Sequence, residues 1–113
     1  MSGQSSEWID SGGGRIDPQP IEAALLSYPN VTDAAAFGVR DPGTSVDQIW
    51  AAIVVASPIE FGELDRYCRD LLGWKAPGIV LEVNVLPRNA DGSLRREELV
   101  AIARRMTQPP QAG

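Results

Sequence analysis

Histidine is absent from this 113-residue sequence, and cysteine and lysine each occur once, as Cys68 and Lys75. Without histidine the chain cannot build a Ser-His-Asp or Cys-His catalytic site, and a zinc site made from its own residues is not expected. A lone cysteine cannot form an internal disulfide, which fits a reducing compartment, so we predict a cytoplasmic protein. Any reaction step that needs the ammonium group of an internal residue must use Lys75 or proceed without one.

Long hydrophobic runs are missing as well. No apolar stretch approaches the roughly 18 residues that span a bilayer, and the start MSGQSSEW lacks the charged and apolar regions of a signal peptide. The net charge of −5 argues against the broad basic face of a general nucleic-acid binder. We therefore expect neither a membrane nor a nucleic acid as partner, although five of the ten basic residues lie in the last quarter of the chain.

The first half of the sequence predicts a hairpin, a helix and two strands. WIDSGGGRID places three glycines between two short strand-like pieces, which is typical of a hairpin. Asp17 and Pro18 fit the N-cap and first residue of a helix, and Tyr28-Pro29-Asn30 ends it. Apolar runs at residues 31–39 and 48–56 predict two strands.

The second half predicts a helix, a strand and a final helix. The apolar face of the first of these helices, which ends at Gly73, comprises Leu64, Tyr67, Cys68, Leu71 and Leu72. A strand at residues 79–86 has Ile79, Leu81, Val83 and Val85 on one face, and the last helix has a stripe of Leu99, Ile102, Ala103 and Met106. We predict that Cys68 belongs to the core, and that Trp8 and Trp50 serve packing or an interface.

The predicted fold class is α+β: a small layer fold with an N-terminal hairpin followed by α-β-β-α-β-α. We assign residues 1–6 to a hinge-like tail, residues 7–106 to the domain, and residues 107–113 to a disordered tail.

Four stretches, taken in order, resemble the small C-terminal domain of the adenylate-forming superfamily, which includes acyl-CoA synthetases, peptide-synthetase adenylation domains and luciferases. They are IDSGGGRIDPQPIEAALLSYPNVTDAAAFGVRD, QIWAAIVVA, WKAPGIVLEVNVLPR and NADGSLRREEL, and the match covers roughly residues 3–105. The resemblance implies a lid on a larger N-terminal domain that holds ATP and the acyl substrate. In one half-reaction a lysine in the last turn of such a lid helps to form the acyl-adenylate. In the other, a glycine-rich hairpin lines the tunnel for the thiol of CoA or of a carrier protein.

The chain departs from this family at positions that carry chemistry. The family's last turn typically reads Pro-Arg-Thr-x-x-Gly-Lys, whereas here residues 87–93 read PRNADGS, so Ser93 stands at the position of the adenylation lysine. A hydroxyl carries no charge to stabilise phosphate oxygens. Gln4, Ser6 and Asp10 replace an arginine, an acid and a lysine near the hinge and hairpin. We therefore expect no catalytic residue in this chain.

Each candidate site residue has a functional and a structural interpretation. Gly12, Gly13 and Gly14 form either a close-approach surface for a pantetheine arm or a flexible tip. Lys75 is either structural or a CoA-phosphate contact. Arg95 and Arg96, expected in the first turn of the last helix, either contact a phosphate or an acidic partner or remain solvated. Ser93 is expected to be the N-cap of that helix.

The leading hypothesis is a free-standing, catalytically incomplete lid that works with a separately encoded adenylating domain. It would support or regulate acyl transfer from an acyl-adenylate to the thiol of CoA or of an acyl or peptidyl carrier protein. Alone it would bind no cofactor, while CoA or phosphopantetheine and acyl-AMP would enter in the complex, and it would have no activity. The alternatives are a non-enzymatic module that binds an acyl carrier, CoA or another protein, and an excised lid of a longer synthetase.

Overall fold

The computed structural model describes residues 9–10, 14–40 and 46–107. The expected tails at 1–6 and 107–113, together with Trp8, Gly12 and Gly13, lie outside the described residues, except for Thr107, which is the last residue of the final helix rather than part of a tail. The observed order of elements is hairpin-α-β-β-α-β-α, so the predicted fold class is confirmed. Among the described residues, no helix is long and apolar enough to cross a bilayer.

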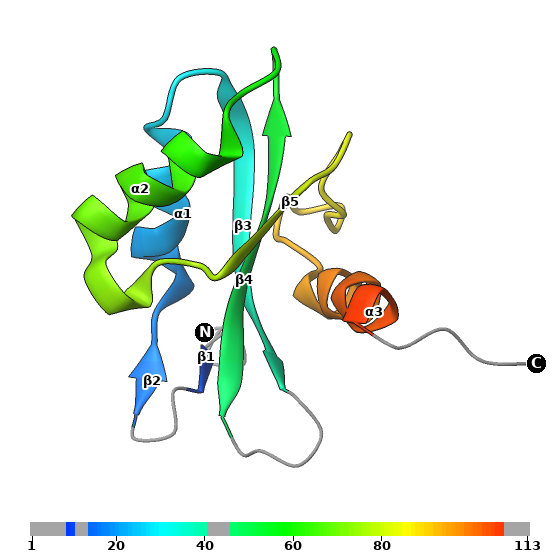
Figure 1. Cartoon of the computed structure of the whole chain (residues 1–113). Coiled ribbons are helices and arrows are strands. Elements are labelled where there is room, and N and C mark those ends of the chain that lie inside the picture. Colours follow the sequence, from blue (N-terminus) through cyan, green and yellow to red (C-terminus); the bar gives the residue numbers. More distant parts are fainter. Residues whose placement is uncertain (1–8, 11–13, 41–45, 108–113) are drawn as a thin grey trace, which may run out of the picture.

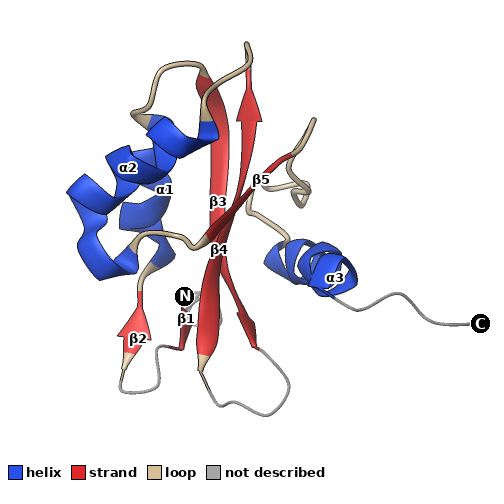
Figure 2. Ribbon diagram, in the orientation of Figure 1, coloured by secondary structure: helices blue, strands red, loops and turns tan. Residues whose placement is uncertain are grey.

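The elements form a three-stranded sheet with helices on both of its faces (Figures 1 and 2). β3 (Val31–Arg40) pairs antiparallel with β4 (Asp47–Val55), and β5 (Ile79–Glu82) pairs parallel with β4, which is therefore the central strand. α1 (Pro18–Leu26) and α2 (Phe61–Leu72) cover one face, and α3 (Arg96–Thr107) covers the other. The two-residue strands β1 (Ile9–Asp10) and β2 (Arg15–Ile16) form the hairpin below one end of the sheet.

The alternation of side chains along β3 and β4 explains the three layers. Ala34 and Ala36 of β3 pack towards α1 and α2, whereas Ala35 and Phe37 face the core beneath α3. Residues of β4 alternate in the same way. Because both faces of these strands are covered, their sequences are almost continuously apolar. Trp50 is 2% exposed in the α3 core, which confirms its packing role.

The predicted boundaries of α1 and α2 are largely confirmed. Asp17 precedes α1, and its carboxylate accepts a 3.0 Å hydrogen bond from the Gln19 N–H, as expected of an N-cap. α1 ends at Leu26, two residues before Tyr28, with Ser27 as its C-cap. α2 ends at Leu72, and its C-cap is Gly73, whose φ of 63° favours glycine.

Three apolar residues assigned to buried faces are instead exposed. β5 ends at Glu82 rather than at residue 86, because the chain then leaves β4, and Val85 is 75% exposed. Leu71 and Met106, each in the last turn of its helix, are 57% and 61% exposed, whereas the neighbouring Leu72 packs against the core. Helical periodicity identified the buried face correctly in the turns of α2 and α3 that precede the last, where Leu64, Cys68, Leu99 and Ala103 are buried.

Candidate functional site

The described residues of the glycine hairpin, 9–10 and 14–16, are anchored by two apolar side chains. Ile9 and Ile16 are 0% and 4% exposed and belong to the core beneath α1 and α2. Gly14 is exposed, and a Cβ at this position would meet no atom within 4 Å. A side chain at this position would therefore extend into open space. Gly12 and Gly13 lie outside the described residues.

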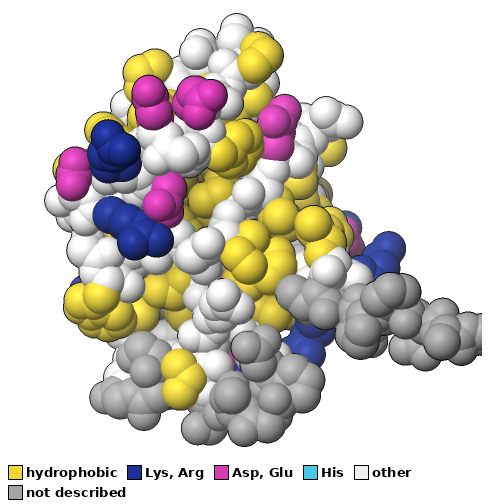
Figure 3. All heavy atoms as spheres, viewed as in Figure 1, with side chains coloured by type: hydrophobic (Ala, Val, Ile, Leu, Met, Phe, Trp, Pro, Cys, Tyr) yellow, Lys and Arg dark blue, Asp and Glu magenta, His cyan; other side chains and the backbone are white. Residues whose placement is uncertain are grey.

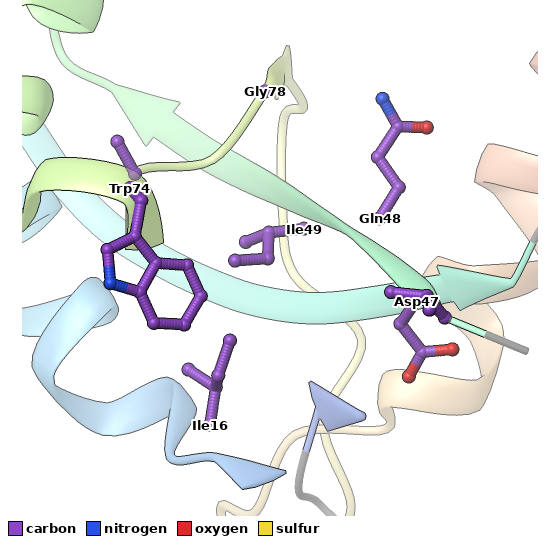
Figure 4. Close-up of a pocket in the computed structure, with 8 residues that line it drawn as sticks. Ile16, Asp47, Gln48, Ile49, Trp74 and Gly78 are labelled. Atoms are coloured by element: carbon purple, nitrogen blue, oxygen red, sulfur yellow. The ribbon is translucent and has the colours of Figure 1, made fainter. Parts of the chain in front are cut away.

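A pocket of about 370 Å³ lies between the glycine hairpin and the segment that follows α2. It is lined by Ile16, Val46, Asp47, Gln48, Ile49, Trp74, Ala76 and Gly78. The side chains of Trp74, Ile16 and Ile49 point towards one another, while Gln48 points away (Figure 4). The structure therefore brings the hairpin and the Trp74–Ala76 segment together, although they are more than 50 positions apart in the sequence.

The wall formed by Trp74 is exposed and carries a positive charge beside it. Trp74 belongs to the short helix η2 (Gly73–Lys75) and is 72% exposed, which is unusual for the largest apolar side chain. The Lys75 Nζ lies 5.6 Å from the centroid of the Trp74 ring, within the range of a cation–π contact.

In Figure 3, charged side chains gather over α2, whereas hydrophobic side chains gather over β5 and at the lower left of the molecule.

Ser93 is not the N-cap of the last helix, so that prediction is wrong. The segment around it stays extended, because an antiparallel bridge joins Arg88 to Leu94, and α3 begins only at Arg96. Instead, the Ser93 hydroxyl donates a 2.7 Å hydrogen bond to the Asp91 carboxylate and accepts one of 2.9 Å from the Asn89 amide. The Ser93 N–H also donates to Asp91, and these bonds lower the pKa of that carboxyl.

An ion pair fastens this turn, residues 87–93, to β3. The Arg88 Nη2 donates to both carboxylate oxygens of Asp33, at 2.7 and 2.9 Å, and its Nη1 donates to the Gly92 carbonyl. Both carboxylate oxygens accept from the same nitrogen, so the contact is a charge-assisted pair rather than a two-nitrogen fork, and the bond to Gly92 gives Arg88 a second point of attachment. The turn is thus held in one orientation on the side of the sheet that carries α3 (Figure 1).

Arg95 and Arg96 differ from each other, and neither is simply solvated. Arg96 is the first residue of α3, and its guanidinium pairs with Glu22 of α1 and donates to the Ala36 carbonyl. Its side chain is only 16% exposed, which indicates a structural role. Arg95 precedes α3, donates its N–H to the Pro87 carbonyl, and pairs with Glu98 at 2.7 Å in a more exposed position.

The candidate residues therefore form two separate groups. Trp74 lines the pocket, Gly14 belongs to the hairpin beside it and Lys75 lies next to Trp74, whereas Ser93 and Arg95 belong to the turn before α3. Figure 1 shows the hairpin at one end of the sheet and the turn near the opposite end.

Cys68 is a core residue, as expected. It is 1% exposed, and burial, with a smaller contribution from Asp65, raises the pKa of its thiol to about 11. A thiol with this pKa stays protonated near neutral pH and is a poor nucleophile. Among the described residues, no cluster of histidine, cysteine and acidic side chains is arranged to hold a metal ion.

Sequence reasoning missed the polar contacts that hold both groups in place. The Asp33 partner of Arg88 and the contact between Asp47 and the hairpin join residues far apart in the chain. The sequence held one signal for each contact. Asp33 interrupts an otherwise apolar strand and Asp47 begins another, and a charged residue at such a position needs a partner.

Comparisons with known proteins agree with this architecture. The family described as AMP-binding enzyme C-terminal domain matches residues 20–93. The 2-succinylbenzoate–CoA ligase of Bacillus licheniformis is 39% identical over 83% of this chain, which covers 20% of that protein.

Two structures of o-succinylbenzoate CoA synthetase from Bacillus subtilis are also similar. One is a double mutant bound to the product analogue OSB-NCoA, with 36% identity and a TM-score of 0.74 over 82% of this chain and 19% of its own. The other contains the acyl-adenylate intermediate OSB-AMP, with 32% identity and a TM-score of 0.76 over 96% of this chain and 21% of its own. The chain spans about a fifth of the relatives' length, and the part that it matches is their C-terminal domain. It therefore belongs to the family of AMP-binding enzyme C-terminal domains, and its relatives are CoA ligases.

Proposed function

We propose that this chain is a lid that works with a separately encoded adenylating domain and supports thioester formation rather than adenylation. The acyl acceptor is the thiol of CoA or of a carrier-bound phosphopantetheine. The observation that carries the proposal is the pocket between the glycine hairpin and Trp74, because it places Ile16 of the hairpin beside the exposed apolar wall of Trp74.

Thioester formation requires the lid to position a thiol. The sulfur attacks the acyl carbonyl carbon, a C–S bond forms, the C–O bond to the phosphate of AMP breaks, and AMP leaves with that electron pair. The thiol proton leaves with solvent. A pantetheine arm is a long, flexible chain, so holding it in the reactive orientation costs conformational entropy. Contacts between the arm and the lid offset that cost before the reaction takes place. In this proposal Gly14 lets the arm approach the backbone, Trp74 and Ile16 pack against its apolar parts, and Lys75 contacts a phosphate.

The turn before α3 is not equipped for the adenylating step. Formation of an acyl-adenylate develops negative charge as pyrophosphate leaves, and a nearby cation stabilises that charge. Ser93 offers a neutral hydroxyl already bonded to Asp91. The neighbouring guanidiniums of Arg88 and Arg96 are paired with Asp33 and Glu22.

A second candidate function uses the same pocket but involves no adenylating domain. The 72% exposure of Trp74 would also suit an interaction module that binds CoA or a phosphopantetheine-bearing carrier protein. In that case the chain would bind CoA but would add nothing to thioester formation by an adenylating domain.

A fusion experiment separates the two candidates. The chain is joined to the adenylating domain of the Bacillus subtilis 2-succinylbenzoate–CoA ligase, in place of that enzyme's own C-terminal domain. The fusion is supplied with the purified acyl-adenylate and CoA, and thioester formation is followed by chromatography. We expect a rate well above that of the adenylating domain alone, reduced about tenfold by Trp74→Ala.

Leu71→Ala is the matched control, since Leu71 is also an exposed apolar residue but does not line the pocket. It should leave the rate unchanged. Equal rates with and without the chain would contradict the lid proposal, and binding of CoA to the isolated chain by NMR would then support the interaction module.

A further inference from the structure

The glycine hairpin has little structure of its own to orient it. β1 and β2 are two residues long and, within the described residues, pair with each other in a sheet separate from β3, β4 and β5. A two-stranded hairpin of this size is not stable alone in water. Burial of Ile9 and Ile16 attaches the hairpin to the core, but apolar contacts are not directional. Its orientation therefore depends on polar contacts with the sheet.

Asp47, the first residue of β4, supplies those contacts. Its Oδ2 accepts a 2.9 Å hydrogen bond from the Asp10 N–H in β1, and its Oδ1 accepts one of 3.2 Å from the Arg40 Nε in β3. The Arg40 Nη2 then donates to the Asp10 carboxylate at 3.1 Å. The Asp47 side chain is only 14% exposed, so its hydrogen bonds are partly shielded from water.

Gly38 leaves the space that the Asp47 side chain occupies. A Cβ at position 38 would lie 2.6 Å from the Asp47 Oδ2 and 2.9 Å from its Cβ, closer than non-bonded atoms approach. Any other residue would displace the carboxylate that binds the Asp10 N–H. The close approach therefore requires glycine at this position of β3.

We propose that Asp47 is the positioning residue of the glycine hairpin, holding it against the ends of β3 and β4 so that it presents the acceptor thiol correctly. The functional part of this inference rests on the proposed role in thioester formation. Asp47 and Ile16 line the same pocket, so a shift of the hairpin also changes the pocket. Because reacting atoms must be placed within about 1 Å, a small displacement reduces the rate of transfer.

The first experiment measures the position of the hairpin in the isolated full chain. Amide hydrogen exchange and residual dipolar couplings are recorded by NMR for Asp47→Ala, Asp47→Asn and Gly38→Ala. In Asp47→Ala, protection of the Asp10 N–H should fall about tenfold or more, and the couplings of residues 10 and 14–16 should change while those of β3 and β4 persist. Asp47→Asn should show a smaller loss because it retains one acceptor oxygen. Gly38→Ala should resemble Asp47→Ala although it removes no polar group.

Asp33→Ala is the matched control. It also removes a partly exposed carboxylate of an arginine pair, but it affects the turn before α3 rather than the hairpin. Unchanged exchange and couplings of the hairpin in Asp47→Ala, or equal changes in Asp33→Ala, would overturn the inference whatever the function of the chain.

The second experiment uses the fusion described above, with Ser93→Lys included so that both half-reactions are measured. Asp47→Ala should lower transfer from the supplied acyl-adenylate to CoA about tenfold, with adenylation unchanged and partial rescue in Asp47→Asn. Parallel losses in both half-reactions would indicate general destabilisation and overturn the functional part. If the chain with Asp47 intact transfers nothing, the proposed function is wrong, and the NMR result alone decides whether Asp47 positions the hairpin.

Discussion

Glu22 and Arg96 join the two helical layers across the outer edge of the sheet. The Glu22 carboxylate accepts a 2.9 Å hydrogen bond from the Ala36 N–H, and the Arg96 Nε donates to the Ala36 carbonyl at 3.0 Å. The two side chains also pair with each other. The outward-facing N–H and C=O of Ala36, which an edge strand leaves without a ladder partner, are thus both satisfied.

Arg96→Ala should therefore destabilise the domain by about 2–4 kcal/mol, between the values typical of exposed and buried pairs. The variant leaves the Glu22 carboxylate, which is 13% exposed, without its cation. The free energy of unfolding is measured by urea titration. Arg95→Ala is the neighbouring control, because it removes an exposed pair with Glu98 and should cost less than about 1 kcal/mol. Equal losses in the free energy of unfolding of the two variants would show that the contact of Arg96 with Glu22 and Ala36 contributes little.

Cys68 should react slowly with thiol reagents and should make stability fall at alkaline pH. The pKa of its thiol rises from 9.0 to about 11 in the folded chain, because burial disfavours the thiolate. The stabilisation of the neutral thiol is fully present below pH 9 and is lost as the pH rises through about 11.

The measurement compares the free energies of unfolding of the unmodified chain and of Cys68→Ala at several pH values. The advantage of cysteine over alanine should shrink between pH 9 and 11. A constant difference over that range would mean that the thiol ionises equally in the folded and unfolded chains.

Asp91 should titrate below the ordinary range of an aspartate, and Ser93→Ala should move its pKa back part of the way. The largest cause of the lowered pKa is the hydrogen bond from the Ser93 N–H, which the variant retains, and the next is the hydroxyl bond, which it removes. Because the folded pKa is lowered, the contribution to stability is present above the unfolded pKa and is lost as the pH falls. Carboxyl carbon shifts in an NMR titration give both pKa values, and identical values would exclude the hydroxyl bond in solution.

Local pattern was sufficient for the elements of the fold but not for the contacts between them. The Asp17-Pro18 cap, the glycine after α2 and the alternation along β3 depend on residues close in sequence, and each was predictable. The start of α3 was not predictable from local pattern. The serine pattern before the helix favoured an N-cap at Ser93, but the bridge between Arg88 and Leu94 keeps the chain extended for two further residues.

The candidate site was predictable in its parts. The resemblance identified the hairpin glycines and Lys75, and Trp74 was visible beside that lysine. That the hairpin and the Trp74 segment line one pocket depends on how β2 and η2 pack against β4, which no local pattern encodes. The carboxylates of Asp47 and Asp33, which fix the hairpin and the turn, act through partners up to 55 positions away.

Ser93→Lys should restore the adenylating half-reaction in the fusion with an adenylating domain. A correctly placed cation contributes about 2.7–4 kcal/mol to a charged transition state, or roughly 10²–10³ in rate. The N–H of residue 93 would still bind Asp91, so the turn should keep its shape, while the two hydroxyl hydrogen bonds are lost. Ser93→Gln is the control of similar length without charge, and both variants are compared while fully folded.

We propose that this lid serves thioester formation and not adenylation, and one fusion that carries the unmodified chain allows both half-reactions to be measured. We expect background ATP–pyrophosphate exchange with 2-succinylbenzoate, together with clear thioester formation from the supplied acyl-adenylate and CoA. Robust exchange with Ser93 in place, or no thioester formation from the supplied acyl-adenylate, would contradict it.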